Sequence, residues 1–358
     1  MLIVDAHEDI AWNMLTFGRD YTRSALITRR EEAGSVAPLY NGNTLLGRTE
    51  WLLGRVGVIF ATLFAAPARF KHGAWDTQCY HDPAEAYRIA SAQLDAYHRL
   101  ADEHEQFRLI GSRADLDEVL ATWAEGKTLS QRRIGLVPLM EGADPIQEPE
   151  QAEEWFERGV RIVGLAWEAT RYAGGTHEPG PLTSEGRRLL GVMADLGMVL
   201  DLSHLAEQAY YEALDHFEGV TIASHSNPRR FTPTSRGLSD AMIERLAERG
   251  GVIGIVPYNV FLKPGVAKSD GKHVASLEDV ADAIDHVCQI TGSAAHVGIG
   301  SDFDGGFGVE HVPQGIDTVA DLQNLRGPLA ERGYTADQIA AIFSGNWIRM
   351  LKQALANT

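Results

Sequence analysis

The chain has 358 residues, and 32 Lys and Arg against 49 Asp and Glu give it a formal net charge of −17 at pH 7. This acidic balance argues against a nucleic-acid-binding surface and against polyanionic partners, because phosphate backbones attract basic proteins. With 44% hydrophobic and 23% charged residues, the composition is globular and excludes a disordered chain. The length fits about two average domains or one large barrel.

Eight short apolar runs, each bounded by glycine or polar residues, predict β-strands at residues 2–4, 58–63, 134–140, 160–165, 198–202, 220–223, 252–256 and 297–299. Apolar residues at helical spacing predict helices between most of them, at residues 83–107, 183–196, 205–217, 240–249, 277–291 and 336–355, the last with a break near Gly345. This alternation predicts a parallel sheet covered on its outer face. The fold class is therefore α/β, most economically a (β/α)8 TIM-type barrel.

No low-complexity stretch or repeat of about 20 to 50 residues interrupts this pattern, so we expect residues 1–358 to form one domain. Residues 21–51 contain Gly34, Pro38, Gly42 and Gly47 without a clear period. They indicate an irregular insertion after the first strand, which we expect to shape a pocket.

No apolar run reaches the roughly 18 to 20 residues of a membrane helix, and no basic segment precedes the apolar residues 2–4. We therefore expect a cytoplasmic protein that does not bind membranes. Cys79 and Cys288 lie far apart in the sequence, which favours small core residues over a disulfide framework.

Polar side chains follow the predicted strands where each one ends. In barrel enzymes the C-terminal ends of the strands form the face that carries the active site. Five of the eight strands present a His or a carboxylate there: His7 and Asp9 follow the first strand, Glu141 the third, His204 the fifth, His225 the sixth and Asp302 the eighth.

His7 and Asp9 are two residues apart, so on an extended segment both side chains point into the barrel mouth. Glu141 follows a very apolar run, where an unpaired carboxylate would cost several kcal/mol, so a cation must lie near it. That cation is either an arginine in a salt bridge or a pair of metal ions bridged by the carboxylate.

His204 and His225 would each be an ordinary core histidine if considered alone. As a pair at one end of the barrel they suit a metal with imidazole ligands, which indicates zinc or a similar ion. The spacing favours two sites that share Glu141, one with His7 and Asp9 and the other with His204 and His225.

Asp302 faces the same mouth and is our candidate for the group that moves a proton from the attacking water to a leaving amine. Asp304 points to the other face on a two-residue period, which predicts a structural role. No lysine lies at the end of the third or fourth strand, so a carbamylated lysine is not expected to bridge the metals.

These residues carry a resemblance to the membrane dipeptidase (renal dipeptidase) family of two-zinc metallopeptidases, and in particular to its soluble bacterial branch. The resemblance spans nearly the whole chain. Its motifs are Asp5-Ala6-His7-Glu8-Asp9, Glu141-Gly142, Asp201-Leu202-Ser203-His204, Ser224-His225-Ser226, Arg236, Gly300-Ser301-Asp302-Phe303-Asp304-Gly305 and Gly345-Asn346.

The resemblance implies an amidohydrolase-like barrel with two Zn²⁺ per chain and a dipeptide substrate, including dipeptides with a C-terminal D-residue. It implies that His7 and Asp9 bind one zinc, that His204 and His225 bind the other, that Glu141 bridges the two, and that Asp302 shuttles the proton. Arg236 stands where the family binds the substrate's terminal carboxylate, and Tyr258 matches a tyrosine that lines the substrate pocket.

One position departs from the family. Well-studied members have a histidine after the fourth strand that contacts the scissile carbonyl, whereas this chain has Trp167. An indole N–H carries no charge and lies farther out than an imidazole N–H. We therefore expect Trp167 to alter the rate of the reaction or the substrate preference. His177, in a glycine-rich loop ten residues later, is an alternative donor.

Two other functions stay open at this point. One is a different hydrolase on the same metals, acting on an N-acyl amino acid, a lactone or a phosphoester. The other is a binding protein with weak catalysis. Barrels of this kind often form homodimers, although no interface patch is evident in the sequence.

Overall fold

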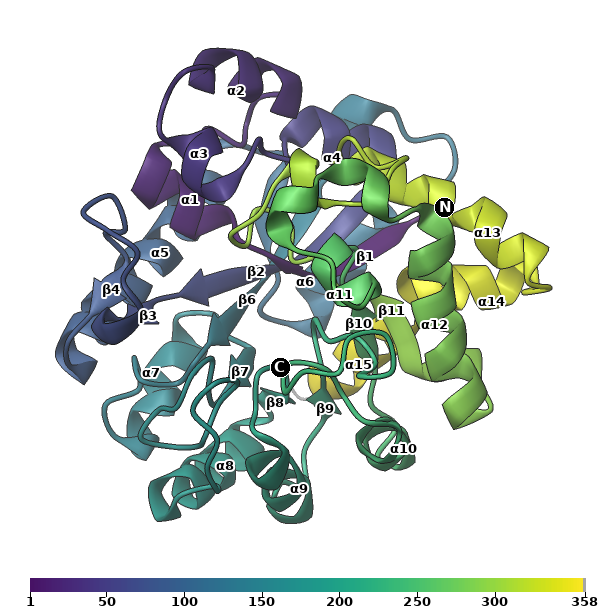
Figure 1. Ribbon diagram of the computed structural model, residues 1–358. Helices are drawn as coiled ribbons and strands as arrows, with labels where there is room; N and C mark the ends of the chain where they lie inside the picture. The colour runs from purple at the N-terminus through teal and green to yellow at the C-terminus, as the bar shows by residue number, and fades with distance from the viewer. Residues whose placement is uncertain (357–358) are drawn as a thin grey trace.

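The computed structural model describes residues 1–356. Eight parallel strands form a ring in the order β10-β11-β1-β2-β6-β7-β8-β9, with helices around them (Figure 1). Each strand overlaps one of the eight predicted runs, so the (β/α)8 barrel is confirmed. The strands of the ring are β1 (Ile3–Glu8), β2 (Val56–Phe64), β6 (Ile134–Glu141), β7 (Ile162–Gly164), β8 (Val199–Asp201), β9 (Thr221–Ile222), β10 (Ile253–Ile255) and β11 (Val297–Ile299).

The ring closes between β9 and β10 through backbone contacts. Ala223 and Ile253 form a parallel bridge, and the amide of Gly254 donates to the carbonyl of Ala223 at 2.8 Å. A Cβ at position 254 would lie 1.8 Å from the carbonyl oxygen of Ser224. The two strands therefore approach this closely only because residue 254 is glycine.

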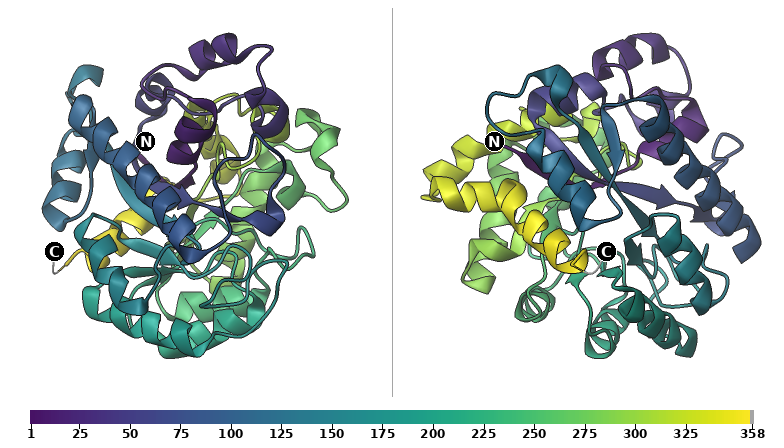
Figure 2. Two further views of the ribbon diagram at one scale, coloured as in Figure 1. Left: turned by 90° about the vertical axis from the view of Figure 1, so that its left-hand side faces the viewer. Right: turned by 180° about the vertical axis from the view of Figure 1, so that it is seen from behind.

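Helices cover the outside of the ring, as Figures 1 and 2 show from three sides. The predicted helices are present, and the last of them is divided by a π-helical segment, Ala341–Gly345, at the predicted break. Helices α1, α2, α3, α4, α6, α7, α11 and α13 were not predicted. The helices are α1 (Ile10–Phe17), α2 (Ala25–Glu32), α3 (Ala37–Asn41), α4 (Arg48–Gly54), α5 (Pro83–Glu103), α6 (Arg113–Ala121), α7 (Ala152–Glu157), α8 (Ser184–Leu196), α9 (Glu207–His216), α10 (Asp240–Glu248), α11 (Asn259–Leu262), α12 (Leu277–Thr291), α13 (Arg326–Glu331), α14 (Ala336–Ala340) and α15 (Asn346–Ala354).

Three short strands lie outside the ring: β5 (Phe107–Leu109) pairs with β6, and β3 (Ala66–Pro67) pairs with β4 (Cys79–Tyr80). Both cysteines are free thiols, with Cys79 partly buried and Cys288 buried. Within residues 1–356, no helix combines the length and the hydropathy that crossing a bilayer requires.

The barrel strands are near-continuous apolar runs because both of their faces are buried. Every residue of β6 is buried, and so is every residue of β2 except Phe64. At one end of the core the indole of Trp347, on α15, donates to the carbonyl of Ile299 at 3.0 Å and meets the ring of Phe60 edge-on. The C-terminal helices, in yellow, lie toward the viewer when the molecule is seen from behind (Figure 2).

The expectation of an irregular insertion at residues 21–51 is wrong in one respect, because this segment contains α2, α3 and the start of α4. The side chain of Ser24 caps α2 by accepting from the amide of Leu26 at 3.2 Å, and Pro38 lies in the first turn of α3, where its fixed φ is tolerated. Helices this short show too few turns for a sequence period to be read. The assignment of the whole chain to one domain stays a prediction.

A buried carboxylate ties this segment to the loop after β11. Asp304 accepts hydrogen bonds from the hydroxyl of Tyr21 at 2.6 Å, from the amide of Leu45 at 2.9 Å and from the guanidinium of Arg19 at 3.0 Å. The side chains of Arg19 and Asp304 are both fully buried. This arrangement agrees with the structural role predicted for Asp304.

The buried pair gives a stability prediction. Arg19→Ala leaves the carboxylate of Asp304 buried without its cation, so we expect the free energy of unfolding to fall by about 3–5 kcal/mol. Arg23→Ala is the matched control, since Arg23 forms its ion pair with Asp20 on the surface, where it is 47% exposed. For Arg23→Ala we expect the free energy of unfolding to fall by less than about 1 kcal/mol. Denaturant titrations of both variants measure the difference, and equal losses would contradict the account.

Candidate metal centre and substrate cavity

Five predicted side chains meet at the C-terminal end of the barrel. His7 lies in β1, Asp9 directly follows that strand, and Glu141 is the last residue of β6. His204 and His225 each stand three residues beyond the ends of β8 and β9. The fold places them together because the carboxyl ends of parallel strands in a barrel open on one rim.

Glu141 lies between two pairs of side chains. One carboxylate oxygen, Oε2, is 3.6 Å from Nε2 of His7, which in turn is 3.6 Å from Oδ2 of Asp9. The other, Oε1, is 3.1 Å from Nε2 of His204 and 3.3 Å from Nε2 of His225. A single carboxylate therefore contacts the imidazoles of both predicted sites.

The donor atoms suit metal ions. Three sets of three side chains bring their potential ligand atoms within 4.8 Å of one another. Nε2 of His7 is buried and has no hydrogen-bond partner in residues 1–356, and Nε2 of His204 and His225 are 3.1 Å apart. Buried imidazole nitrogens that face one another and a carboxylate are an arrangement that a cation stabilises. The sets are His7, Asp9 and Glu141; Glu141, His204 and His225; and His7, His225 and Asp302.

Hydrogen bonds at the opposite ring nitrogens hold two of these imidazoles in place. Nδ1 of His204 lies 2.8 Å from the hydroxyl of Thr176, and Nδ1 of His225 lies 2.7 Å from the hydroxyl of Ser224. Ser224 in turn donates to the buried carboxylate of Asp201. With Nδ1 engaged in this way, Nε2 is the nitrogen that remains available to a metal.

The electrostatics favour added positive charge at the cluster. Burial and the guanidinium of Arg236 lower the pKa of His204 to about 4, so its ring is neutral, as a ligand must be. Burial opposes protonation of His7, yet the carboxylates of Glu141 and Asp9 outweigh it and raise the pKa of His7 well above its ordinary value. A metal cation would satisfy the same carboxylates that favour that proton.

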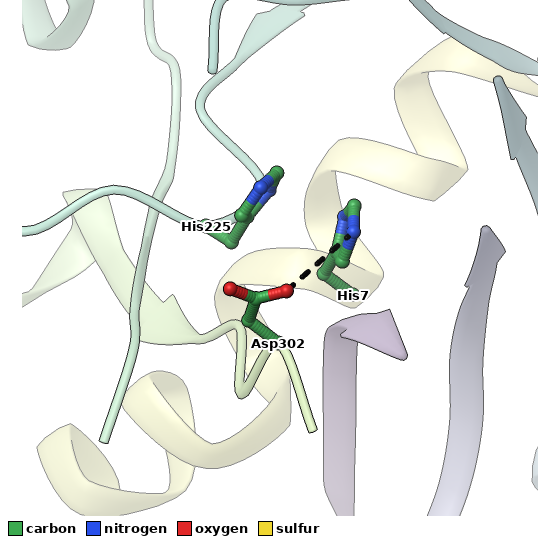
Figure 3. A group of neighbouring side chains, drawn as sticks. All are labelled: His7, His225 and Asp302. Carbon is green, nitrogen blue, oxygen red and sulfur yellow. Dashed lines mark ion pairs between the residues drawn. The ribbon is translucent and has the colours of Figure 1, made fainter. Parts of the chain in front are cut away.

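Asp302 points toward this cluster from the loop after β11, with Oδ1 3.9 Å from Nε2 of His7 (Figure 3). Its φ of 57° lies in the left-handed region, as does the φ of 67° at His204. Such backbone costs about 1–3 kcal/mol for a residue other than glycine and is concentrated at functional sites. Burial, opposed by His7 but reinforced by the charges of Asp9 and Glu141, raises the pKa of the Asp302 carboxyl well above its usual range.

A cavity of about 710 Å³ opens over the cluster, within the range of about 300–1,000 Å³ typical of small-molecule sites. Its lining includes Glu141 and Asp302 and the three side chains predicted to contact substrate, Arg236, Tyr258 and Trp167. The cavity therefore connects the candidate metal centre with all three.

Each of these three side chains is held by contacts with neighbouring residues. The guanidinium of Arg236 donates to the hydroxyl of Ser226 at 3.0 Å and to the carbonyl of His225 at 2.5 Å. The ring of Tyr258 stacks on Phe307 with centroids 4.4 Å apart. Trp167 is half-buried, and its ring centroid lies 6.2 Å from that of His204.

His177 also lines the cavity, but its side chain is 73% exposed. Its Nδ1 lies 2.5 Å from the buried carboxylate of Glu168, and within residues 1–356 its ring makes no hydrogen bond to the five-residue cluster. The adjacent Thr176, which sequence reasoning missed, is the residue of this loop that contacts His204. Nothing in its sequence position, 28 residues before His204, signals that contact.

Comparison with known proteins shows which family the chain belongs to. The sequence profile of the membrane dipeptidase family, peptidase family M19, matches residues 1–358. An uncharacterized dipeptidase of Schizosaccharomyces pombe is 27% identical over 87% of this chain and 73% of its own length. A dipeptidase of Aspergillus oryzae is 26% identical over 98% of this chain and 77% of its own length.

Solved structures agree at the level of the fold. A probable dipeptidase of Pseudomonas aeruginosa superposes with a TM-score of 0.80 at 19% identity, covering 100% of this chain and 96% of that one. A metallopeptidase of Rhodobacter sphaeroides, bound to a phosphinate mimic of the dipeptide L-Ala-D-Ala, has a TM-score of 0.76 at 21% identity and covers 99% of each chain. With the family profile matched from the first residue to the last, the chain belongs to the membrane dipeptidase family, peptidase family M19.

Proposed function

We propose that this protein is a two-zinc dipeptidase that hydrolyses short peptides, chiefly dipeptides, including those with a C-terminal D-residue. The observation that carries this proposal is the position of Glu141, which lies within 3.6 Å of Nε2 of His7, His204 and His225. The L-Ala-D-Ala mimic bound to the Rhodobacter sphaeroides relative supports a D-residue at the second position. A cytoplasmic location and a homodimer stay predictions.

His7 and Asp9 would hold one zinc, His204 and His225 would hold the second, and Glu141 would be shared between them. Imidazole nitrogen and carboxylate oxygen are ligands that zinc accepts. When bound, the two ions supply Lewis acidity toward a carbonyl oxygen and lower the pKa of a water molecule.

Asp302 acts as the proton carrier. Its carboxylate takes a proton from the attacking water and delivers it to the nitrogen of the departing amine. Two features support this role: the carboxylate lies at the edge of the cluster, 3.9 Å from His7, and burial raises its pKa, so it holds a proton more readily than an exposed aspartate. The amide of Asp302 donates to the carbonyl of His7 at 3.0 Å, which fixes the loop.

Arg236 binds the free carboxylate of the substrate. Two of its N–H groups are engaged by Ser226 and His225, which orients the planar guanidinium while other N–H groups remain for a ligand. Tyr258 and Trp167 add aromatic surface to the cavity. Trp167 provides no charged donor to the scissile carbonyl. The polar groups of the substrate are therefore bound by the zinc ions and by Arg236.

Metal analysis combined with a dipeptide panel tests this function. We expect near two zinc equivalents per chain by mass spectrometry, and hydrolysis of L,L- and L,D-dipeptides that a chelator abolishes and added zinc restores. Two bound zinc ions without turnover of any dipeptide would favour the weakly catalytic binding protein. Turnover of N-acyl amino acids, lactones or phosphoesters but no dipeptide would favour the other hydrolase. Dipeptide hydrolysis that survives complete removal of metal would contradict the proposal.

Asp302→Asn tests the proton carrier. The amide keeps the shape of the side chain but cannot accept the proton, so we expect kcat to fall about a hundredfold or more while both zinc ions remain bound. Asp20→Asn is the control, because Asp20 lies at the surface in an ion pair with Arg23. An unchanged kcat in Asp302→Asn would remove Asp302 from this role.

A further inference from the structure

We propose that the cavity selects a dipeptide whose amino-terminal residue carries an aromatic side chain, through an aromatic wall formed by Trp12, Tyr40 and Trp75. This inference rests on the proposed dipeptidase function and adds the class of substrate. All three side chains line the cavity that contains Glu141 and Asp302.

The aromatic wall is built before any ligand arrives. The rings of Tyr40 and Trp75 are stacked, with centroids 4.4 Å apart and planes 9° apart, and Trp12 meets Trp75 edge-on at 6.3 Å. Phe17 also stacks on Trp75, at 5.7 Å. Rings held by such contacts lose little side-chain entropy when a ligand binds.

The aromatic wall lies across the barrel mouth from the carboxylate-binding arginine. Trp12 and Tyr40 follow β1 and Trp75 follows β2, whereas Arg236 follows β9. In the ring order β2 and β9 are separated by β6, β7 and β8, and are therefore opposite each other in the eight-stranded barrel. A dipeptide with its carboxylate on Arg236 and its peptide bond at Glu141 must point its amino-terminal residue toward the aromatic wall.

The chemistry of the aromatic wall favours a flat apolar group. Tyr40 is 43% exposed and Trp75 is only partly buried, so aromatic surface remains open to a ligand. A dipeptide of two small residues would leave much of a 710 Å³ cavity to water. An aromatic ring would bury apolar area there and gain stacking contacts with the aromatic wall. Asp76, buried beside Trp75 in the lining, opposes an acidic side chain.

Three substrates that differ only in the first side chain measure the effect: L-Phe-D-Ala, L-Leu-D-Ala and L-Ala-D-Ala. We expect kcat/KM for L-Phe-D-Ala to exceed that for L-Ala-D-Ala about tenfold or more, with L-Leu-D-Ala between them. In Trp75→Ala we expect this Phe-to-Ala ratio to fall about tenfold, and in Trp75→Phe to be largely kept. Tyr211→Ala, which removes a half-buried ring on α9 outside the cavity lining, should leave the ratio unchanged.

Equal kcat/KM for the Phe and Ala substrates, or a preference that survives in Trp75→Ala, would overturn the inference while leaving the dipeptidase function intact. If no dipeptide is hydrolysed, the proposed function fails, and calorimetry with phosphinic dipeptide mimics tests the aromatic wall separately. There, tighter binding of the Phe mimic than of the Ala mimic supports the aromatic wall, and equal Kd values overturn it.

Discussion

The structure of the site depends on one buried carboxylate, Glu141, at the end of a strand that is apolar throughout. An ionised carboxylate without partners costs several kcal/mol in such surroundings, so the fold must bring compensating groups to it. Burial opposes its ionisation, but the charge of His7 and the close imidazoles of His204 and His225 hold the pKa of Glu141 well below its usual range. His7 lies in β1, and His204 and His225 follow β8 and β9, so the parallel barrel is what makes the three imidazoles neighbours.

The surroundings of these imidazoles set their orientation as firmly as the strands do. Asp201, the buried last residue of β8, accepts from the backbone amides of Ser203 and Ser224 and so joins the segments that carry His204 and His225. The left-handed backbone at His204 and Asp302 persists only because the surrounding structure holds it in place. Catalysis by positioned groups needs such rigidity, because a misplacement of about 1 Å can cost a hundredfold in rate.

The barrel could be predicted from the sequence because buried parallel strands are nearly continuous apolar runs, and the cluster could be predicted because five of the eight runs are followed by a His or a carboxylate. The short helices α2 and α3 could not, since helices of eight and five residues leave too few turns for a period. Thr176 and the aromatic wall were also missed. Their partners lie in other segments of the chain, and contacts between such segments depend on a geometry that residue spacing does not encode.

The central claim is that Glu141 joins two metal sites. X-ray diffraction from crystals grown with zinc, recorded above and below the zinc absorption edge, tests it most directly. The account predicts two anomalous peaks, one beside His7 and Asp9 and the other beside His204 and His225, with the carboxylate of Glu141 between them. A single peak that Glu141 does not contact, or no peak at this rim of the barrel, would contradict it.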